Sequence, residues 1–254
     1  MRILLTNDDG VHAAGLRLLE EVARRISDDV WVVAPTEEQS GTGHSLTLTK
    51  PVRLRRLGEQ RFAVAGTPTD SVMMAVAHIM TDRRPDLILS GINRGANLAE
   101  DVTYSGTVSA AMEGALAGIP SVALSQSYAR EGMGDTVPFE AAGAWAEQVL
   151  RAIISEPMAP RTLVNVNFPA LAASEIKGIR VTQQGLRDYG RLRITERTDP
   201  RGYPYFWFGL GTMIETPGHS TDLEAIADGY VAVTPLLLDM THGPSVARLA
   251  KLFC

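Results

Sequence analysis

Short apolar runs alternate with helix-like patterns along the first two-thirds of the chain. Ile3–Leu5 reads as a buried strand, and the polar residues of Thr6–Gly10 end it. Apolar residues then recur at helical spacing between Leu16 and Ile26. Val30–Ala34 is a second apolar run, which Pro35 stops. A strand, a helix and a strand at this spacing predict a parallel βαβ unit.

The same alternation continues to about residue 170. It predicts strands at 52–57, 62–65, 87–89, 121–125 and 163–166, and helices at 69–80, 108–116 and 140–153. These elements predict an α/β fold in which helices cover both faces of a mostly parallel sheet. We expect one domain over residues 1–254, with a core at about 1–170 and an extension at about 171–254.

The alternation weakens after Pro169. Residues 179–182, 203–208 and 231–234 are predicted to be antiparallel strands, and residues 246–253 a closing helix. The segment 203–208 contains the densest aromatic cluster of the chain. Such a segment suits an arm that reaches over a partner subunit, and it suits ordinary packing in a core or at a sheet edge equally well.

Composition and charge narrow the class of protein. Hydrophobic residues make up 45% of the 254 residues and the net charge is -5, so we expect no polybasic surface for a nucleic-acid duplex. The chain has one cysteine, Cys254, which excludes an intramolecular disulfide. No stretch is long and apolar enough to span a membrane. We therefore expect a cytoplasmic protein.

Two adjacent carboxylates follow the first predicted strand. Asp8 and Asp9 would repel each other unless something positive lies beside them, and a hard divalent cation with oxygen ligands would meet that need. Asn7–Gly10 is also good turn chemistry, so a simple turn is the alternative. The position at a strand end favours the metal, because ligands collect beyond the carboxyl ends of strands in open parallel sheets.

Two further oxygen donors follow other predicted strands. Asn93 can offer an amide oxygen, and Ser40 can offer a hydroxyl, although each alone is typical of a turn or cap. Together with the two aspartates they form an all-oxygen set. Such a set favours Mg²⁺, Mn²⁺ or Ca²⁺ over Zn²⁺.

Ser105, Gly106 and Thr107 stand at the start of a predicted helix of small residues. A helix N-terminus presents free N–H groups, and Gly106 would allow a phosphate to approach the backbone closely. A hydroxyl here would also cap the helix, which is compatible with phosphate binding. Capping is the stronger interpretation for Gly66–Asp70, where Thr67 is the expected N-cap. The roles of His12 and His44 stay open.

Several known motifs are absent from the sequence. There is no phosphate-binding loop of the G-x-x-x-x-G-K-[ST] type, no complete dinucleotide fingerprint and no G-x-S-x-G serine elbow. The adjacent acids also differ from the D-x-D spacing of phosphatases that form an aspartyl phosphate.

The motifs that are present resemble those of the SurE family of nucleotidases. Five occur in order over the first 114 residues: Arg2–Gly10, Val33–Pro35 leading to Ser40–Ser45, Gly66–Asp70, Ser90–Asn97 and Ser105–Gly114. The likeness runs to about Pro169 and continues more loosely through Asn165–Pro169, Thr182–Gln183 and Gly229–Val231.

The resemblance implies a Rossmann-like core with a β-rich extension used in homodimers or homotetramers. It implies a 5′-nucleotidase that needs a divalent cation, Mg²⁺ or Mn²⁺, and that hydrolyses nucleoside monophosphates, with 3′-nucleotides and, for some members, short polyphosphate as further substrates. The metal ligands carried over are Asp8, Asp9, Ser40 and Asn93. The residues carried over to the phosphate side of the pocket are Asn97, Ser105, Gly106 and Thr107.

The catalytic hypothesis is that Asp8 or Asp9 orients the attacking water or takes its proton. One alternative is a module that binds nucleotide or metal without turnover. Another is a metal-dependent deacetylase, but that group has a histidine where Asn7 stands.

Overall fold

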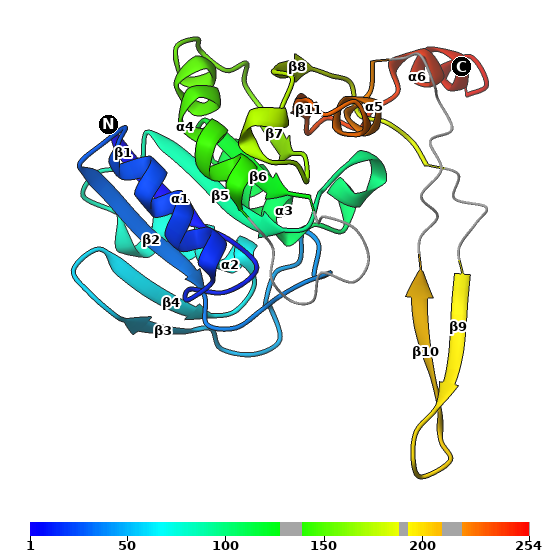
Figure 1. Cartoon of the computed structure of the whole chain (residues 1–254), viewed down its shortest axis with the longest axis horizontal. Helices are drawn as coiled ribbons and strands as arrows, with labels where there is room; N and C mark the ends of the chain where they lie inside the picture. Colours follow the sequence, from blue (N-terminus) through cyan, green and yellow to red (C-terminus); the bar gives the residue numbers. More distant parts are fainter. Residues whose placement is uncertain (128–138, 188–192, 210–219, 254) are drawn as a thin grey trace.

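The computed structural model describes residues 1–127, 139–187, 193–209 and 220–253. Its main feature is a nine-stranded sheet in the order β3-β4-β2-β1-β5-β6-β7-β11-β8, with β9 and β10 paired separately (Figure 1). The strands are β1 Arg2–Thr6, β2 Asp29–Pro35, β3 Arg53–Arg56, β4 Arg61–Ala65, β5 Leu87–Arg94, β6 Ser121–Gln126, β7 Thr162–Phe168, β8 Ile179–Val181, β9 Arg193–Thr198, β10 Pro204–Gly209 and β11 Val231–Leu237.

Helices cover both faces of this sheet. The helical elements are α1 Ala14–Arg24, α2 Pro68–Met74, η1 Ala75–Ile79, η2 Ala99–Thr103, α3 Gly106–Leu116, α4 Glu140–Ile154, η3 Ala173–Glu175, α5 Asp222–Ala227 and α6 Gly243–Ala250. Helices α1 and α4 pack on one face, and α2 and α3 on the other. No helix in the described part of the chain is both long and apolar enough to cross a membrane.

The strand β1 shows why this arrangement forms. Successive side chains of a strand point to opposite faces. Ile3 and Leu5 accordingly join the apolar cluster under α1 and α4, and Leu4 joins the cluster under α2. All three are fully buried, which is typical of a parallel strand covered on both sides. The expected α/β fold with a mostly parallel sheet is confirmed.

The chain reverses its direction of travel across the sheet at β1. It proceeds from β1 to β2 and β4 on one side, and then returns to place β5 on the other side of β1. Such a reversal is a topological switch point, where the loops after the two central strands separate and leave a crevice. The carboxyl ends of β1 and β5 meet here, because Thr6 lies opposite Ser90 in the parallel register.

The antiparallel orientation that was expected for the strand at 179–182 is wrong. Strand β8 runs parallel to β11, whereas β11 runs antiparallel to β7. The short connection over residues 169–178 turns the chain back after β7, and β11 later enters between β7 and β8. Since both β8 and β11 oppose β7, they must be parallel to each other. The antiparallel pairing of β9 with β10 agrees with the expectation for 203–208.

Several other boundaries differ from the sequence-based expectation, among them the following. The helix expected over 69–80 is α2 followed by the π-helix η1. The strand expected at 87–89 continues to Arg94, and the following loop contains the 3₁₀ helix η2. The closing helix α6 ends at Ala250. The cap predicted at Thr67 is confirmed, because Thr67 and Asp70 form a reciprocal capping box at the start of α2.

Helix α1 approaches the sheet too closely for a side chain at Gly15. A Cβ there would lie 1.9 Å from the carbonyl oxygen of Ile92 in β5. On α4, by contrast, a Cβ at Gly143 would make only ordinary contacts, at 3.7 Å or more, with Leu18.

We expect Gly15→Ala to lower the free energy of unfolding by about 1–3 kcal/mol, because the clash with the strand backbone outweighs the better helix propensity of alanine. Thermal unfolding would measure this as a loss of several degrees in Tm. The matched control Gly143→Ala should leave Tm unchanged or raise it. Equal effects of the two substitutions would contradict the close packing of α1 on β5.

Candidate metal and phosphate site

Asp8 lies directly beyond β1 and is only 4% exposed. Its carboxylate accepts a short hydrogen bond from the Thr107 hydroxyl, in the first turn of α3. Its carbonyl oxygen accepts a hydrogen bond of 2.7 Å from the Gln39 N–H, in the loop that follows β2. Segments from three parts of the sequence therefore meet at this one aspartate.

Gly106 lets α3 come this close. A Cβ at Gly106 would lie 2.8 Å from the Cβ and 3.1 Å from a carboxylate oxygen of Asp8. Ser105 is the N-cap of α3, and its side chain accepts a hydrogen bond of 3.1 Å from the Val108 N–H. The N–H groups of Gly106 and Thr107 have no acceptor within the helix, since they belong to its first turn. The predicted cap is confirmed, and the structure brings this helix end against Asp8.

Asp9 faces the end of β5. Its carboxylate accepts a hydrogen bond of 3.0 Å from the Arg94 backbone N–H. The pairing of β5 with β6 shifts by one residue between Ser90 and Asn93, which is a bulge of the kind that re-aims side chains near functional sites. The amide of Asn93 donates to the Gly95 carbonyl at 2.9 Å, so its oxygen is left to accept or to coordinate.

Burial raises the pKa of both carboxyl groups. For Asp8 the value rises to about 6, mainly through desolvation, with a further increase from Asp9, while the Thr107 hydroxyl lowers it. The pKa of Asp9 is raised by desolvation and lowered by Arg94. The negative charge of Glu38 raises the pKa of both groups. The site therefore concentrates negative charge that a cation would relieve.

Ser40 lies on the loop that crosses this site, and its hydroxyl donates to Glu38 at 2.8 Å. Glu38 is also 3.8 Å from the Arg94 guanidinium. The same loop rests on the segment before α3, because the Gly43 N–H donates to the Tyr104 carbonyl at 3.1 Å. The structure thus brings the Ser40 loop to the aspartates through Gln39, but the Ser40 hydroxyl itself is turned to Glu38.

Asn97 is held mainly by its own backbone. Its N–H donates to the Asn167 side chain at 2.8 Å, and its carbonyl accepts from the side-chain amides of Asn165 and Asn167 at 2.8 and 3.1 Å. Its side-chain amide donates to the Ser125 hydroxyl at 2.8 Å. All four residues are buried, so Asn97 is fixed to the carboxyl ends of β6 and β7.

The donors at this strand end fit a hard cation. Among the described residues, the buried oxygens Thr6 Oγ1, Asn7 Oδ1 and Ser90 Oγ have no hydrogen-bond partner, which is unusual for buried polar atoms. Oxygen ligands are the ones that Mg²⁺ and Mn²⁺ prefer. Over the described ranges, no group of three His, Cys, Asp or Glu side chains is placed to hold a metal ion, so two carboxylates would have to act with neutral oxygens.

The two histidines near these motifs have different surroundings. His44 Nε2 lies 3.1 Å from a carboxylate oxygen of Glu113 in α3. His12 is exposed, and its carbonyl accepts from Arg17.

Sequence reasoning did not single out Glu38, Arg94, Asn165 or Asn167 as parts of the site. The two asparagines had a visible signal, since they alternate with apolar residues inside a buried strand. Glu38 had none, because its position near Asp9 depends on how a long polar loop folds. Arg94 lies inside the Ser90–Asn97 motif, but its contact with Asp9 depends on where the extended strand β5 ends.

The fold and the site define a doubly wound α/β protein with a pair of carboxylates and further oxygen donors at its switch point. The family model of the survival protein SurE matches residues 3–191. The chain belongs to the SurE family.

Relatives and a solved structure agree with this assignment. The chain is 64% identical over 253 residues to the 5′-nucleotidase SurE of Rhizorhabdus wittichii, and 56% identical over 253 residues to that of Erythrobacter litoralis, in each case over 100% of both chains. The crystal structure of the SurE protein from Aquifex aeolicus matches with a TM-score of 0.85 and 40% identity, again covering 100% of both chains.

The burial of Asp8 predicts how metal-free stability depends on pH. A carboxyl group whose folded pKa is raised destabilises the fold once it ionises. The penalty is absent below the unfolded pKa of 3.8, grows between 3.8 and about 6, and is complete above that range.

Asp8→Asn, measured in EDTA, should therefore raise Tm above that of the wild type at pH 8 by several degrees, and by less at pH 5. The exposed Asp28→Asn, at the opposite end of β2, gives the baseline. An advantage for Asp8→Asn that does not change with pH would contradict the raised pKa.

Proposed function

We propose that this chain is a metal-dependent phosphatase that hydrolyses nucleoside 5′-monophosphates to nucleoside and phosphate. The observation that carries the proposal is the contact between Asp8, the first residue of the carboxylate pair, and the N-terminus of α3. This contact sets a cation-attracting group against an anion-attracting one, and a phosphoester bound to a divalent cation needs both. The relatives that are named 5′-nucleotidase SurE support the choice of nucleotides as substrates.

Asp8, Asp9, Ser40 and Asn93 are the proposed ligands of Mg²⁺ or Mn²⁺. When bound, such a cation would neutralise the paired carboxylates and polarise a phosphoryl oxygen. Asp8 stays oriented through the hydrogen bond from Thr107, and Asp9 through the one from the Arg94 N–H. Ser40 would need to turn its hydroxyl away from Glu38 to reach the ion.

The start of α3 is the proposed phosphate side of the site. The free N–H groups of Gly106 and Thr107 can donate to phosphoryl oxygens, and the helix dipole favours negative charge there. Ser105 keeps this turn in place by capping it. Such fixed donors stabilise the charge that spreads over the phosphoryl oxygens during transfer. Asn97 completes this side, with the second N–H of its amide as the available donor.

A carboxylate of the aspartate pair orients the attacking water or takes its proton. We further propose that residues 1–254 act as one domain in the cytoplasm, and that 3′-nucleotides and short polyphosphate are additional substrates.

The test is phosphate release from the four nucleoside 5′-monophosphates with Mg²⁺, Mn²⁺ or EDTA. We expect release that depends on the metal, and that falls by about 10²–10⁴-fold in Asp9→Asn because one ligand and one proton acceptor are lost. Asp28→Asn changes an exposed aspartate far from the site and should keep wild-type turnover.

Two results would overturn the proposed function. One is a folded wild type that binds nucleotide but releases no phosphate with any metal, which would indicate a binding module. The other is near-normal turnover in Asp9→Asn.

We also propose that the extension joins copies of the chain in a homodimer or homotetramer. The β9–β10 hairpin projects away from the sheet (Figure 1). Its exposed aromatics include Trp207, 63% exposed, and Tyr205, whose rings meet edge to face at 6.3 Å. Apolar side chains gathered on a projecting hairpin are typical of a protein interface.

Replacing both Tyr205 and Trp207 by serine should lower the molar mass measured by light scattering, because the apolar contact area is lost. Leu48→Ser changes an exposed apolar residue outside the hairpin and should not alter the mass. A wild type that is monomeric at micromolar concentration would contradict the proposal.

A further inference from the structure

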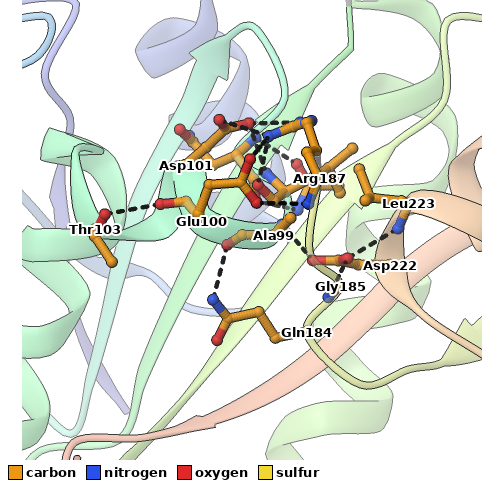
Figure 2. A network of polar contacts seen from close by, with 12 residues as sticks. Ala99, Glu100, Asp101, Thr103, Gln184, Gly185, Arg187, Asp222 and Leu223 are labelled. Carbon is orange, nitrogen blue, oxygen red and sulfur yellow. Dashed lines mark hydrogen bonds and ion pairs between the residues drawn. The ribbon is translucent and has the colours of Figure 1, made fainter. Parts of the chain in front are cut away.

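The loop between Asn97 and α3 is held by residues of the C-terminal extension. Asp222, at the start of α5, accepts the Ala99 N–H at 2.8 Å with one carboxylate oxygen. Its other oxygen accepts the N–H groups of Gly185 and Leu223, both at 2.8 Å. Asp222 is fully buried, and Figure 2 shows its carboxylate between Gly185 and Leu223 of the extension and Ala99 of the loop. One carboxylate therefore joins three backbone segments.

The hydrogen bond to Asp222 is made by Ala99, whose backbone conformation is unfavourable on its own. Ala99 has a φ of 53°, in the left-handed region that alanine rarely adopts. Its N–H is bound by Asp222, and its carbonyl accepts from the Gln184 side chain at 2.9 Å. Both contacts come from the extension, so the extension stabilises the strained backbone conformation of Ala99.

Arg187 makes a second attachment to the same loop. Its guanidinium forms a two-pronged pair with the Asp101 carboxylate, both bonds 2.7 Å long, and also reaches Glu100 and the Leu98 carbonyl at 3.3 Å (Figure 2). The side chains of Arg187 and Glu100 are each 14% exposed, and that of Asp101 is 21% exposed. This geometry is the strong, directional form of a carboxylate–arginine contact.

Backbone hydrogen bonds connect Asp101 directly to the phosphate side of the site. The Asp101 carbonyl accepts the N–H groups of Tyr104 and Ser105, at 2.9 and 3.0 Å. Ser105 is the N-cap of α3. The Tyr104 carbonyl accepts a hydrogen bond from the N–H of Gly43, in the loop that contains Ser40. A shift of Asp101 would therefore move the α3 start relative to Asp8.

Arg187 also affects the charge near the phosphate. Glu100 and Asp101 place two negative charges on the loop that leads to the α3 N-terminus. Arg187 lies against both. Without its charge, these carboxylates would repel an incoming phosphate.

We propose that Arg187 and Asp222 are positioning residues for the substrate phosphate, which hold the Leu98–Ser105 loop so that the start of α3 faces the aspartate pair. The inference rests on the proposed function for the identity of the substrate. It makes the extension a part of the active site. On the metal side, in contrast, three of the four proposed ligands, Asp8, Asp9 and Asn93, share no hydrogen bond or ion pair with Arg187 or Asp222 in the described part of the structure. The fourth, Ser40, lies one step further from Arg187, on the loop that the Gly43–Tyr104 hydrogen bond joins to Asp101.

The experiment measures inorganic phosphate and Mn²⁺ separately on the full chain. Asp222→Asn and Arg187→Lys keep the size of each side chain while removing the charge or the fork. We expect the dissociation constant of phosphate, measured by calorimetry with Mn²⁺ present, to rise about 10–100-fold, because small misplacements are costly in such a site. The dissociation constant of Mn²⁺ should stay within about twofold of the wild-type value. The KM for nucleotide should rise together with the dissociation constant of phosphate.

The matched controls lie in the same extension. Arg180 pairs with Asp228 at 2.7 Å on the surface, away from the loop, so Arg180→Lys and Asp228→Asn should leave all three constants unchanged. Since a variant that only loses stability keeps the phosphate affinity of its folded fraction, wild-type phosphate affinity in Asp222→Asn and Arg187→Lys would overturn the proposal. Equal losses of phosphate and Mn²⁺ affinity would overturn it too.

The phosphate measurement needs no turnover, which separates the two proposals. A wild type that binds phosphate but cleaves no nucleotide would refute the proposed function, and the two variants would still decide the positioning role.

Discussion

The rest of the site depends on the burial of a carboxylate pair at the end of β1. A charged group removed from water is stable only if partners replace the lost hydration. Asp8 has one strong partner in Thr107, and yet desolvation still raises its pKa to about 6. Hydrogen bonds in the fold therefore offset only part of the free-energy cost of burying the charged Asp8 side chain. Under the proposed function, a bound cation would relieve this cost, because it would offset a repulsion that already exists in the folded chain.

The backbone supplies most of the geometry around this pair. Gly106 brings a helix terminus against Asp8, and the bulge before Asn93 turns the end of β5 toward Asp9. Neither device adds a formal positive charge. The site is thus polarised from one side by N–H groups and from the other by carboxylates, which is the polarity that the proposed cation and phosphate would require. A doubly wound sheet provides this arrangement wherever its strand order reverses.

Much of this could be predicted from the sequence because local patterns determine it. The apolar run at Ile3–Leu5 and the cap at Thr67 each follow from the chemistry of a few neighbouring residues. The parallel pairing of β8 could not be predicted in this way, since it depends on β11, which enters the sheet some fifty residues later along the chain. The ligand roles of Ser40 and Asn93 stay predictions. The contribution of Glu38 to the pKa of Asp9 was equally invisible, because a long polar loop carries no periodic signal.

The extension explains why the loop before α3 can be both long and ordered. A polar loop of this kind has few apolar contacts of its own, and its conformational entropy would favour many arrangements. Asn97 is fixed on the inner side by the asparagines of β7, and Ala99 on the outer side by Asp222. These two attachments, one from β7 and one from the extension, restrict the conformations of the segment that ends at Ser105. If the β9–β10 hairpin also contacts another subunit, assembly and the phosphate side of the site would be coupled, because Arg187 precedes the hairpin in the sequence and Asp222 follows it.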